Sequence, residues 1–155
     1  MAAPSGVYTL IRSAVTTSTA ITIQQVLAPA GTMIEPVRAW AEQSTVTTSA
    51  QTRIQLLKKT AVATVTSATP ALLGNAMQAS KCVGGTAASG ITATVEGTDG
   101  AVIIEEGFNI VNGWLYLPVP EERTYCINQA IALKFPTAPT SAGYSSGITW
   151  LEYAG

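Results

Sequence analysis

The chain has 155 residues, of which 47% are hydrophobic and only 11% are charged, and its net charge is −1 at neutral pH. One domain is expected at this length, and a chain of this mass buries enough surface to fold without disulfides or metal ions. Lys58 and Lys59 form its only basic pair, so no basic stripe is available to neutralise phosphates, which argues against nucleic acid as a partner.

The low charge also bears on what the surface does. An ordinary soluble domain carries about 25% charged residues, whereas here Thr, Ser and Ala take their place. Two interpretations are open: a soluble domain coated with Thr, or a domain whose surface is largely covered by partners.

Segments rich in Thr, Val, Ile and aromatic residues, punctuated by Gly, Pro and Ser, predict β-strands along the whole chain. In chain order the predicted strands span residues 7–12, 19–28, 34–43, 51–59, 114–119, 129–135 and 148–153. Strand 19–28 is expected to be half-buried, with Thr22 and Gln24 facing away from Ile21 and Ile23. In strand 51–59 the two-residue period places Ile54 and Leu56 inward and Arg53 and Gln55 outward.

Two further segments lie between these strands. Residues 60–90 show no legible period and are expected to form a long excursion ordered by neighbours. The run Gly97-Thr98-Asp99-Gly100, flanked by Val95 and Val102, predicts a hairpin turn that accounts for Asp99.

The pattern as a whole predicts an all-β fold without a long helix. We expect a single antiparallel β-sandwich, jelly-roll-like, with about eight strands. Residues 1–12 are expected to form an N-terminal arm and the first strand, and residues 13–155 the sandwich domain.

Targeting and cysteine usage suggest synthesis in the host cytoplasm. The first residues lack the features of a secretory signal, and the uncharged stretches are broken by Pro, Gly and Asn, so no membrane span is expected. Cys82 and Cys126 are expected to be free buried thiols, with one disulfide as the alternative.

The residues needed for common catalytic chemistry are missing, and we expect no enzyme, cofactor or metal site. There is no His, which removes the usual nucleophile pairs and the commonest zinc ligand. The pairs Glu105-Glu106 and Glu121-Glu122 cannot each form a glycosidase dyad, because neighbours along a strand point to opposite faces. No phosphate-binding loop is present.

Aromatic residues supply the candidate interface. The run Trp114-Leu115-Tyr116-Leu117 is apolar on both faces of its predicted strand, so one face must meet something beyond its own sheet. Candidate interface residues are Pro4 in the arm, with Tyr8, Trp40, Trp114 and Tyr116 as aromatic anchors; a place in the core is the alternative for each aromatic.

Two blocks give the chain a family resemblance. The strand Ala130–Phe135 followed by Pro136-Thr137-Ala138-Pro139-Thr140, and the closing Thr149-Trp150-Leu151-Glu152-Tyr153, resemble tailed-phage virion proteins that decorate capsids or form minor structural β-sandwiches. The resemblance implies a virion role, with trimers at local threefold positions of the shell and an N-terminal arm reaching neighbours. It brings no catalytic residue.

The sequence therefore predicts a structural virion protein on the capsid surface that binds major capsid subunits and its own copies, as a homotrimer. The alternative is a receptor- or glycan-binding tail or fibre module. That alternative requires an exposed aromatic platform with convergent polar groups, for which Trp40 and Trp114 are the candidates.

Overall fold

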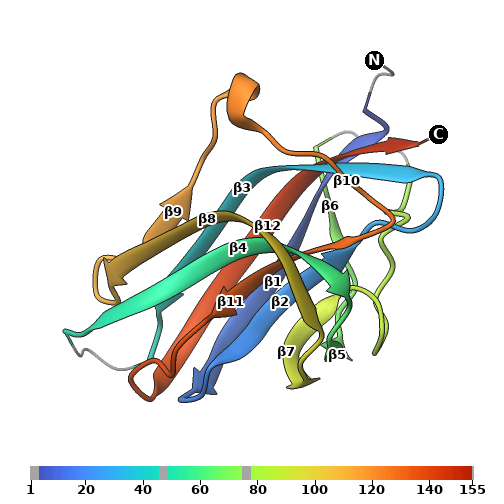
Figure 1. Cartoon of the computed structure of the whole chain (residues 1–155). Coiled ribbons are helices and arrows are strands. Elements are labelled where there is room, and N and C mark those ends of the chain that lie inside the picture. Colours follow the sequence, from blue (N-terminus) through green and yellow to red (C-terminus); the bar gives the residue numbers. More distant parts are fainter. Residues whose placement is uncertain (1–3, 46–48, 75–77, 155) are drawn as a thin grey trace.

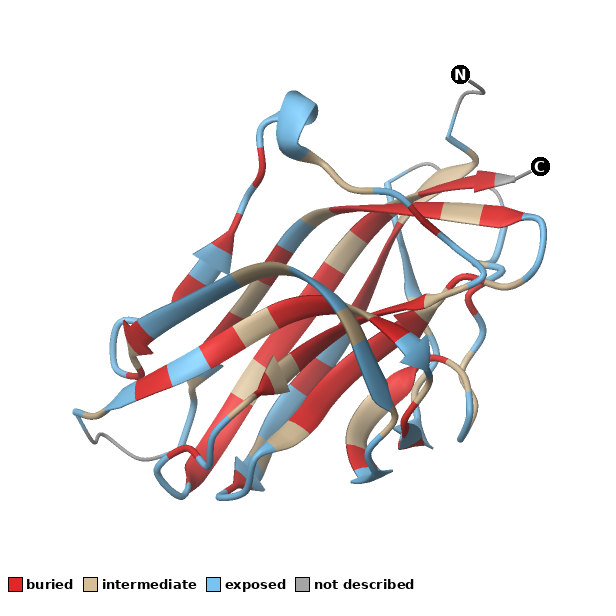
Figure 2. Cartoon of the chain, in the orientation of Figure 1, coloured by how far each residue is buried: buried red, intermediate tan, exposed pale blue. Residues whose placement is uncertain are grey.

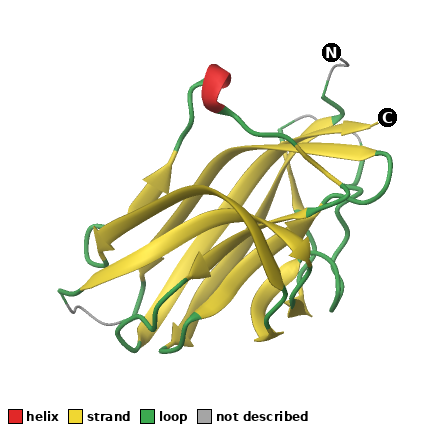
Figure 3. Ribbon diagram, viewed as in Figure 1, coloured by secondary structure: helices red, strands yellow, loops and turns green. Residues whose placement is uncertain are grey.

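A computed structural model describes residues 4–45, 49–74 and 78–154. The described residues form twelve strands in two six-stranded antiparallel sheets packed face to face (Figures 1 and 3). Their only helical element is the 3-10 turn η1 (Pro120–Glu122). The all-β sandwich is confirmed, but the expectation of about eight strands was too low. Strands of two to four residues are too short to show a period.

The first sheet, sheet A, has the order β10, β3, β12, β1, β6, and β9 also pairs with β3. Its strands are β1 (Gly6–Thr17), β3 (Thr32–Gln43), β6 (Ala71–Leu73), β9 (Trp114–Tyr116), β10 (Cys126–Ile127) and β12 (Ala142–Ala154). β9 and β10 contact different parts of the same edge of β3, at Ala39–Ala41 and at Met33 and Ile34 respectively. The chain between β9 and β10 therefore runs along the margin of sheet A.

The second sheet, sheet B, has the order β5, β7, β2, β11, β4, β8. Its strands are β2 (Ile21–Leu27), β4 (Gln51–Ala61), β5 (Thr64–Ser67), β7 (Gly90–Val95), β8 (Thr98–Asn109) and β11 (Ala130–Phe135). The predicted alternation in β4 is confirmed: Ile54 and Leu56 are fully buried and Arg53 is exposed. Figure 2 shows β8, an edge strand, as the most exposed long strand of this sheet.

The core lies between the sheets and takes alternate residues from both. Leu10, Ile34 and Trp150 enter from sheet A, and Ile131 and Leu133 from sheet B. Within sheet A, Tyr8 stacks on its strand neighbour Trp150, and across the layer Phe135 and Tyr144 meet edge to face. Period-two burial of β-branched and aromatic side chains is what makes these segments strands.

The predicted hairpin at residues 97–100 is wrong. β7 pairs with β2 and β5, whereas β8 pairs with β4, so the two strands leave the connection without pairing to each other. Asp99 lies in β8 instead, and its carboxylate binds the Nζ atoms of Lys59 (2.7 Å) and Lys134 (2.5 Å). Ion pairs to the adjacent strand β4 and to β11 beyond it position this segment, and the Asp-Gly sequence does not form the hairpin turn that it predicted.

The expected excursion at residues 60–90 is partly ordered into sheet, because it contains the end of β4 and the short strands β5 and β6. Residues 75–77 lie outside the described ranges. The expected division after residue 12 falls within β1, which is paired on both sides by β12 and β6. Ser5 already hydrogen-bonds Glu152, and the arm residues 1–3 also lie outside the described ranges.

The outer face of sheet B is covered in part by its own chain, over β2 and β11. Ala130 and Ala132 face away from the core, yet both are fully buried. The amide of Gln25, beside Ala132, bonds the backbone of Ala63 and Ala88. The expectation that β2 is half-buried was therefore wrong: five of its seven residues are buried, including Thr22 and Gln24. These glutamine amides are tolerated in the interior because their polar groups have hydrogen-bond partners.

Cys82 and Cys126 are free and buried, as predicted. Burial raises the pKa of both thiols, that of Cys126 to about 11, and for Cys82 the charge of the nearby Glu152 adds to the effect. Both cysteines are therefore held as neutral thiols.

Candidate protein-binding surface

The structure separates the five predicted interface residues. Tyr8, Trp114 and Tyr116 are 1%, 6% and 8% exposed, so these three lie in the core and cannot serve as anchors for a partner. Pro4 is exposed ahead of β1, and Trp40 is half-buried on the outer face of sheet A. The interface prediction is therefore wrong for Tyr8, Trp114 and Tyr116. In each case the aromatic ring, which is larger than the side chains next to it in the strand, faces the core.

The alternation along β9 shows which side chains face outward instead. Trp114 and Tyr116 stack on each other, with ring centroids 6.4 Å apart, and the indole Nε1 of Trp114 donates to Glu106 (2.6 Å). Leu115 and Leu117, the intervening residues, are 56% and 68% exposed. Leu115 and Leu117 are thus the residues of this apolar run that face outward, on the side that was predicted to meet something beyond its own sheet.

Leu115 and Leu117 belong to a larger group that we call the apolar margin. Half of the twelve exposed large hydrophobic side chains among the described residues fall between residues 111 and 127, namely Val111, Leu115, Leu117, Val119, Tyr125 and Ile127. They lie on the segment from the turn before β9, through η1, to β10, which pairs with the edge of β3 at β9 and β10 and arches away from it at η1 (Figure 1). Scattered apolar residues are normal on a surface, but a concentration of them marks an interaction site.

The apolar margin is tied to sheet A at its far end. Arg123 forms an ion pair with the buried carboxylate of Glu35 (3.3 Å), and Tyr153 donates to the same carboxylate (2.5 Å). That hydrogen bond, together with burial, raises the pKa of Tyr153 to about 12. The ring of Tyr125 meets that of Tyr153 edge-on. After η1 the segment is therefore anchored to sheet A by these contacts, which fixes the position of its exposed apolar side chains.

Beside the margin, the outer face of sheet A carries a row of residues paired across four strands. Leu115 of β9 pairs with Trp40 of β3, Trp40 with Gly147 of β12, and Gly147 with Ile11 of β1. A Cβ on Gly147 would lie 2.7 Å from Cε2 of Trp40, closer still to its Nε1, and 3.0 Å from Cδ1 of Ile11. The missing side chain is what lets the indole lie on the sheet.

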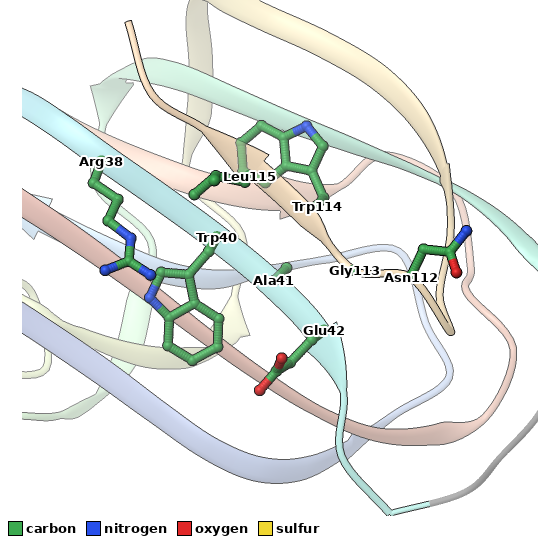
Figure 4. Close-up of a pocket in the computed structure, with 8 residues that line it drawn as sticks. All are labelled: Arg38, Trp40, Ala41, Glu42, Asn112, Gly113, Trp114 and Leu115. Atoms are coloured by element: carbon green, nitrogen blue, oxygen red, sulfur yellow. The ribbon is translucent and has the colours of Figure 1, made fainter.

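A shallow groove of about 240 Å³ opens around this indole, and we call it the Trp40 groove. Its lining comes from β3 and from the turn into β9: Arg38, Trp40, Ala41, Glu42, Asn112, Gly113, Trp114 and Leu115. Figure 4 shows the guanidinium of Arg38 on one side of the indole of Trp40 and the carboxylate of Glu42 on the other. Within the described chain, the side chains of Arg38, Glu42 and Asn112 make no hydrogen bond or ion pair.

Other charged groups bind within the fold. Glu105 binds Arg53 and Gln55 on the outer side of sheet B, while Glu106 binds Trp114, so this adjacent pair is divided between different partners. Among the described residues no group of three or more His, Cys, Asp or Glu could hold a metal ion. No helix within those ranges has the length and apolar character needed to cross a membrane.

The buried side chain of Arg12 has no counterion among the described residues. Arg12 is fully buried and donates to the hydroxyls of Thr17 (2.6 Å) and Thr92 (2.9 Å) and to the carbonyl of Tyr144 (2.8 Å). No described carboxylate pairs with it, and desolvation lowers its pKa to about 10. The guanidinium links β1, β7 and β12 through neutral acceptors.

Comparison with known proteins identifies no relative: no family model matches the sequence, no curated protein matches it, and no solved structure matches the fold.

Proposed function

We propose that the protein is a structural component of a phage capsid, which it decorates and stabilises by binding major capsid subunits and its own copies. The observation that carries the proposal is the apolar margin, where six large apolar side chains are exposed along one edge of sheet A. The resemblance to virion proteins supplies the partner, and the margin supplies a surface suited to it. Apolar surface at an edge strand is a feature of protein-binding sites.

The distribution of charge supports a surface that is covered in use. Four of the seventeen charged side chains, those of Arg12, Glu35, Lys59 and Glu152, are buried. The other thirteen are spread over 7056 Å² of accessible surface. A free monomer with so few surface charges has little to prevent association, and association is what a shell-bound homotrimer requires.

The edge geometry supports strand addition as part of the contact. β9 is three residues long and pairs only with β3 among the described strands, so its outer edge has free backbone groups next to Leu115. A partner strand could pair there while its side chains pack on the margin. Backbone pairing gives affinity, and the apolar side chains fix the register.

The test replaces margin residues without touching the core. The double variant L117S/V119S removes two side chains that are 68% and 53% exposed, and V83S/V95S, at 61% and 62%, is the matched control elsewhere on the surface. Both should melt like the wild type, since substitutions at exposed positions usually change stability by within about 0.5 kcal/mol. Light scattering should report a trimer for the wild type and the control, and a smaller species for L117S/V119S.

Binding to the shell is measured by co-sedimentation with capsids lacking this protein. Wild type and control should sediment with the capsids and raise their melting temperature, because a ligand of the assembled shell stabilises it by mass action. The margin variant should do neither. A margin variant that still forms trimers and still protects the shell would refute the proposal.

A further inference from the structure

We propose that the Trp40 groove binds one ring of an uncharged saccharide. The inference concerns a second site and a second class of ligand, and it goes beyond the proposed attachment to a capsid. It rests on three features of the outer face of sheet A: a flat aromatic platform, unengaged polar side chains around it, and a floor whose backbone groups are already paired.

The platform is the indole of Trp40. One side of this ring lies against Gly147, where a Cβ would be 2.7 Å from Cε2, and the other side forms part of the groove. Ile11 closes the row at the far end, with its Cδ1 3.0 Å from the same position. The face of an aromatic ring carries partial negative charge, so it attracts the C–H groups on the flat side of a pyranose ring.

The polar groups around the platform are free to meet hydroxyls. Arg38 and Glu42 lie two residues before and after Trp40, on the same face of β3. Asn112 enters from the turn before β9. As these three side chains have no partners within the described chain, they offer guanidinium donors, carboxylate acceptors and an amide that is both. A ring bearing several hydroxyls needs that mixture.

The floor of the groove favours a saccharide over a peptide strand. β3 is paired at Ala39–Ala41 by β9 on one edge and by β12 on the other. No backbone donor or acceptor of β3 is therefore left at the groove for a strand to use. A ligand lying on β3 is therefore recognised by side chains, which suits a sugar ring, and only the outer edge of β9 at the rim of the groove offers backbone groups.

Charge and size narrow the ligand further. Arg38 and Glu42 carry opposite charges on the two sides of the indole (Figure 4), so neither sign of net charge is favoured over the whole groove. The groove volume of about 240 Å³ is below the roughly 300 Å³ at the lower limit of pockets for drug-sized molecules. It accommodates one ring, and any longer glycan extends beyond it over the sheet.

The site is tested by saturation-transfer NMR with the methyl glycosides of glucose, galactose, mannose and N-acetylglucosamine at millimolar concentration, and by binding to an array of neutral and sialylated oligosaccharides. At least one neutral sugar should receive saturation, through its ring protons. W40A should weaken binding about tenfold or more, which is about 1.4 kcal/mol. R38A and E42A should each weaken it as well, without a change in melting temperature.

The control distinguishes this site from the apolar margin. L117S/V119S should bind the sugar like the wild type, and W40A should still bind capsids. Absence of binding to every glycoside and to the array overturns the proposal, as does equal binding by W40A. Loss of capsid binding in W40A, with no sugar bound by the wild type, would assign the groove to a protein contact instead.

Discussion

The substitution K59M isolates a buried charge on the outer face of sheet B. Lys59 has a fully buried side chain whose Nζ lies 2.7 Å from Asp99 and 3.3 Å from Glu96. Each pair has a gross Coulomb energy of roughly 5–6 kcal/mol at an effective dielectric constant of about 20. Desolvation of the lysine offsets much of that energy.

The expected loss of stability in K59M arises because two carboxylates lose a cationic partner. Met keeps the apolar stem of Lys59, so packing is retained, but Glu96 and Asp99 are left with Lys134 as their only cation. Removal of one partner from a buried pair costs about 3–5 kcal/mol, and the partial exposure of both carboxylates places K59M at the lower end, about 3 kcal/mol. For a domain of this size that is roughly 6–12 °C in melting temperature.

Calorimetry of K59M beside K58M measures the effect. Lys58 is the adjacent residue, and its Nζ donates to the carbonyl of Tyr125 at an exposed position. The same substitution there should change stability by within about 0.5 kcal/mol. A melting temperature for K59M equal to that of K58M, or above it, would show that the ion pairs of Lys59 contribute no net stability.

Three further expectations follow from single sites. Burial alone would raise the pKa of Glu96, but hydrogen bonds from Thr22 and the charge of Lys59 outweigh it and hold the pKa below 4.5. The stabilisation that Glu96 contributes is therefore complete above pH 4.5 and is lost as the pH falls through the lowered pKa. The difference in urea midpoint between wild type and E96Q should narrow on acidification, and a constant difference would contradict this. G147A should displace the indole of Trp40, which gives a red-shifted emission and loss of sugar binding; an unchanged spectrum would disprove the contact. Cys82 and Cys126 should react with iodoacetamide only in urea, as followed by mass spectrometry, and rapid labelling of the folded protein would refute their burial.

Local pattern accounts for the strands that alternate cleanly. In β4 the order Arg53, Ile54, Gln55, Leu56 fixes both the strand and its orientation, because polar residues mark the outward positions. In β9 every position is apolar, so the period cannot say which side chains face the core. Orientation there depends on the fit of Trp114 and Tyr116 between the sheets, which is a property of the packed molecule.

Long-range partners account for what the pattern missed. Gln24 and Gln25 look like surface residues, yet both are fully buried, since Ser146 and Leu10 bond the first and Ala63 and Ala88 the second. Those partners lie in other strands or in the segment expected to be irregular. For the Trp40 groove the sequence named the aromatic residue but not its surroundings, because only the β3 and β12 register brings Gly147 under the indole.

The two outer faces of the sandwich differ, and that difference locates both proposed sites. On sheet B the chain around Ala63, Ala88 and Glu96 closes over the strands, and buried amides and ion pairs satisfy what it covers. On sheet A no segment among the described residues lies over the row from Leu115 to Ile11, which are 56% and 45% exposed. Sheet B thus covers its central strands with its own chain and exposes mainly polar groups such as Arg53 and Glu105, whereas the outer face of sheet A exposes apolar and aromatic groups suited to partners. The apolar margin and the Trp40 groove both belong to that face, and Leu115 is the residue they share.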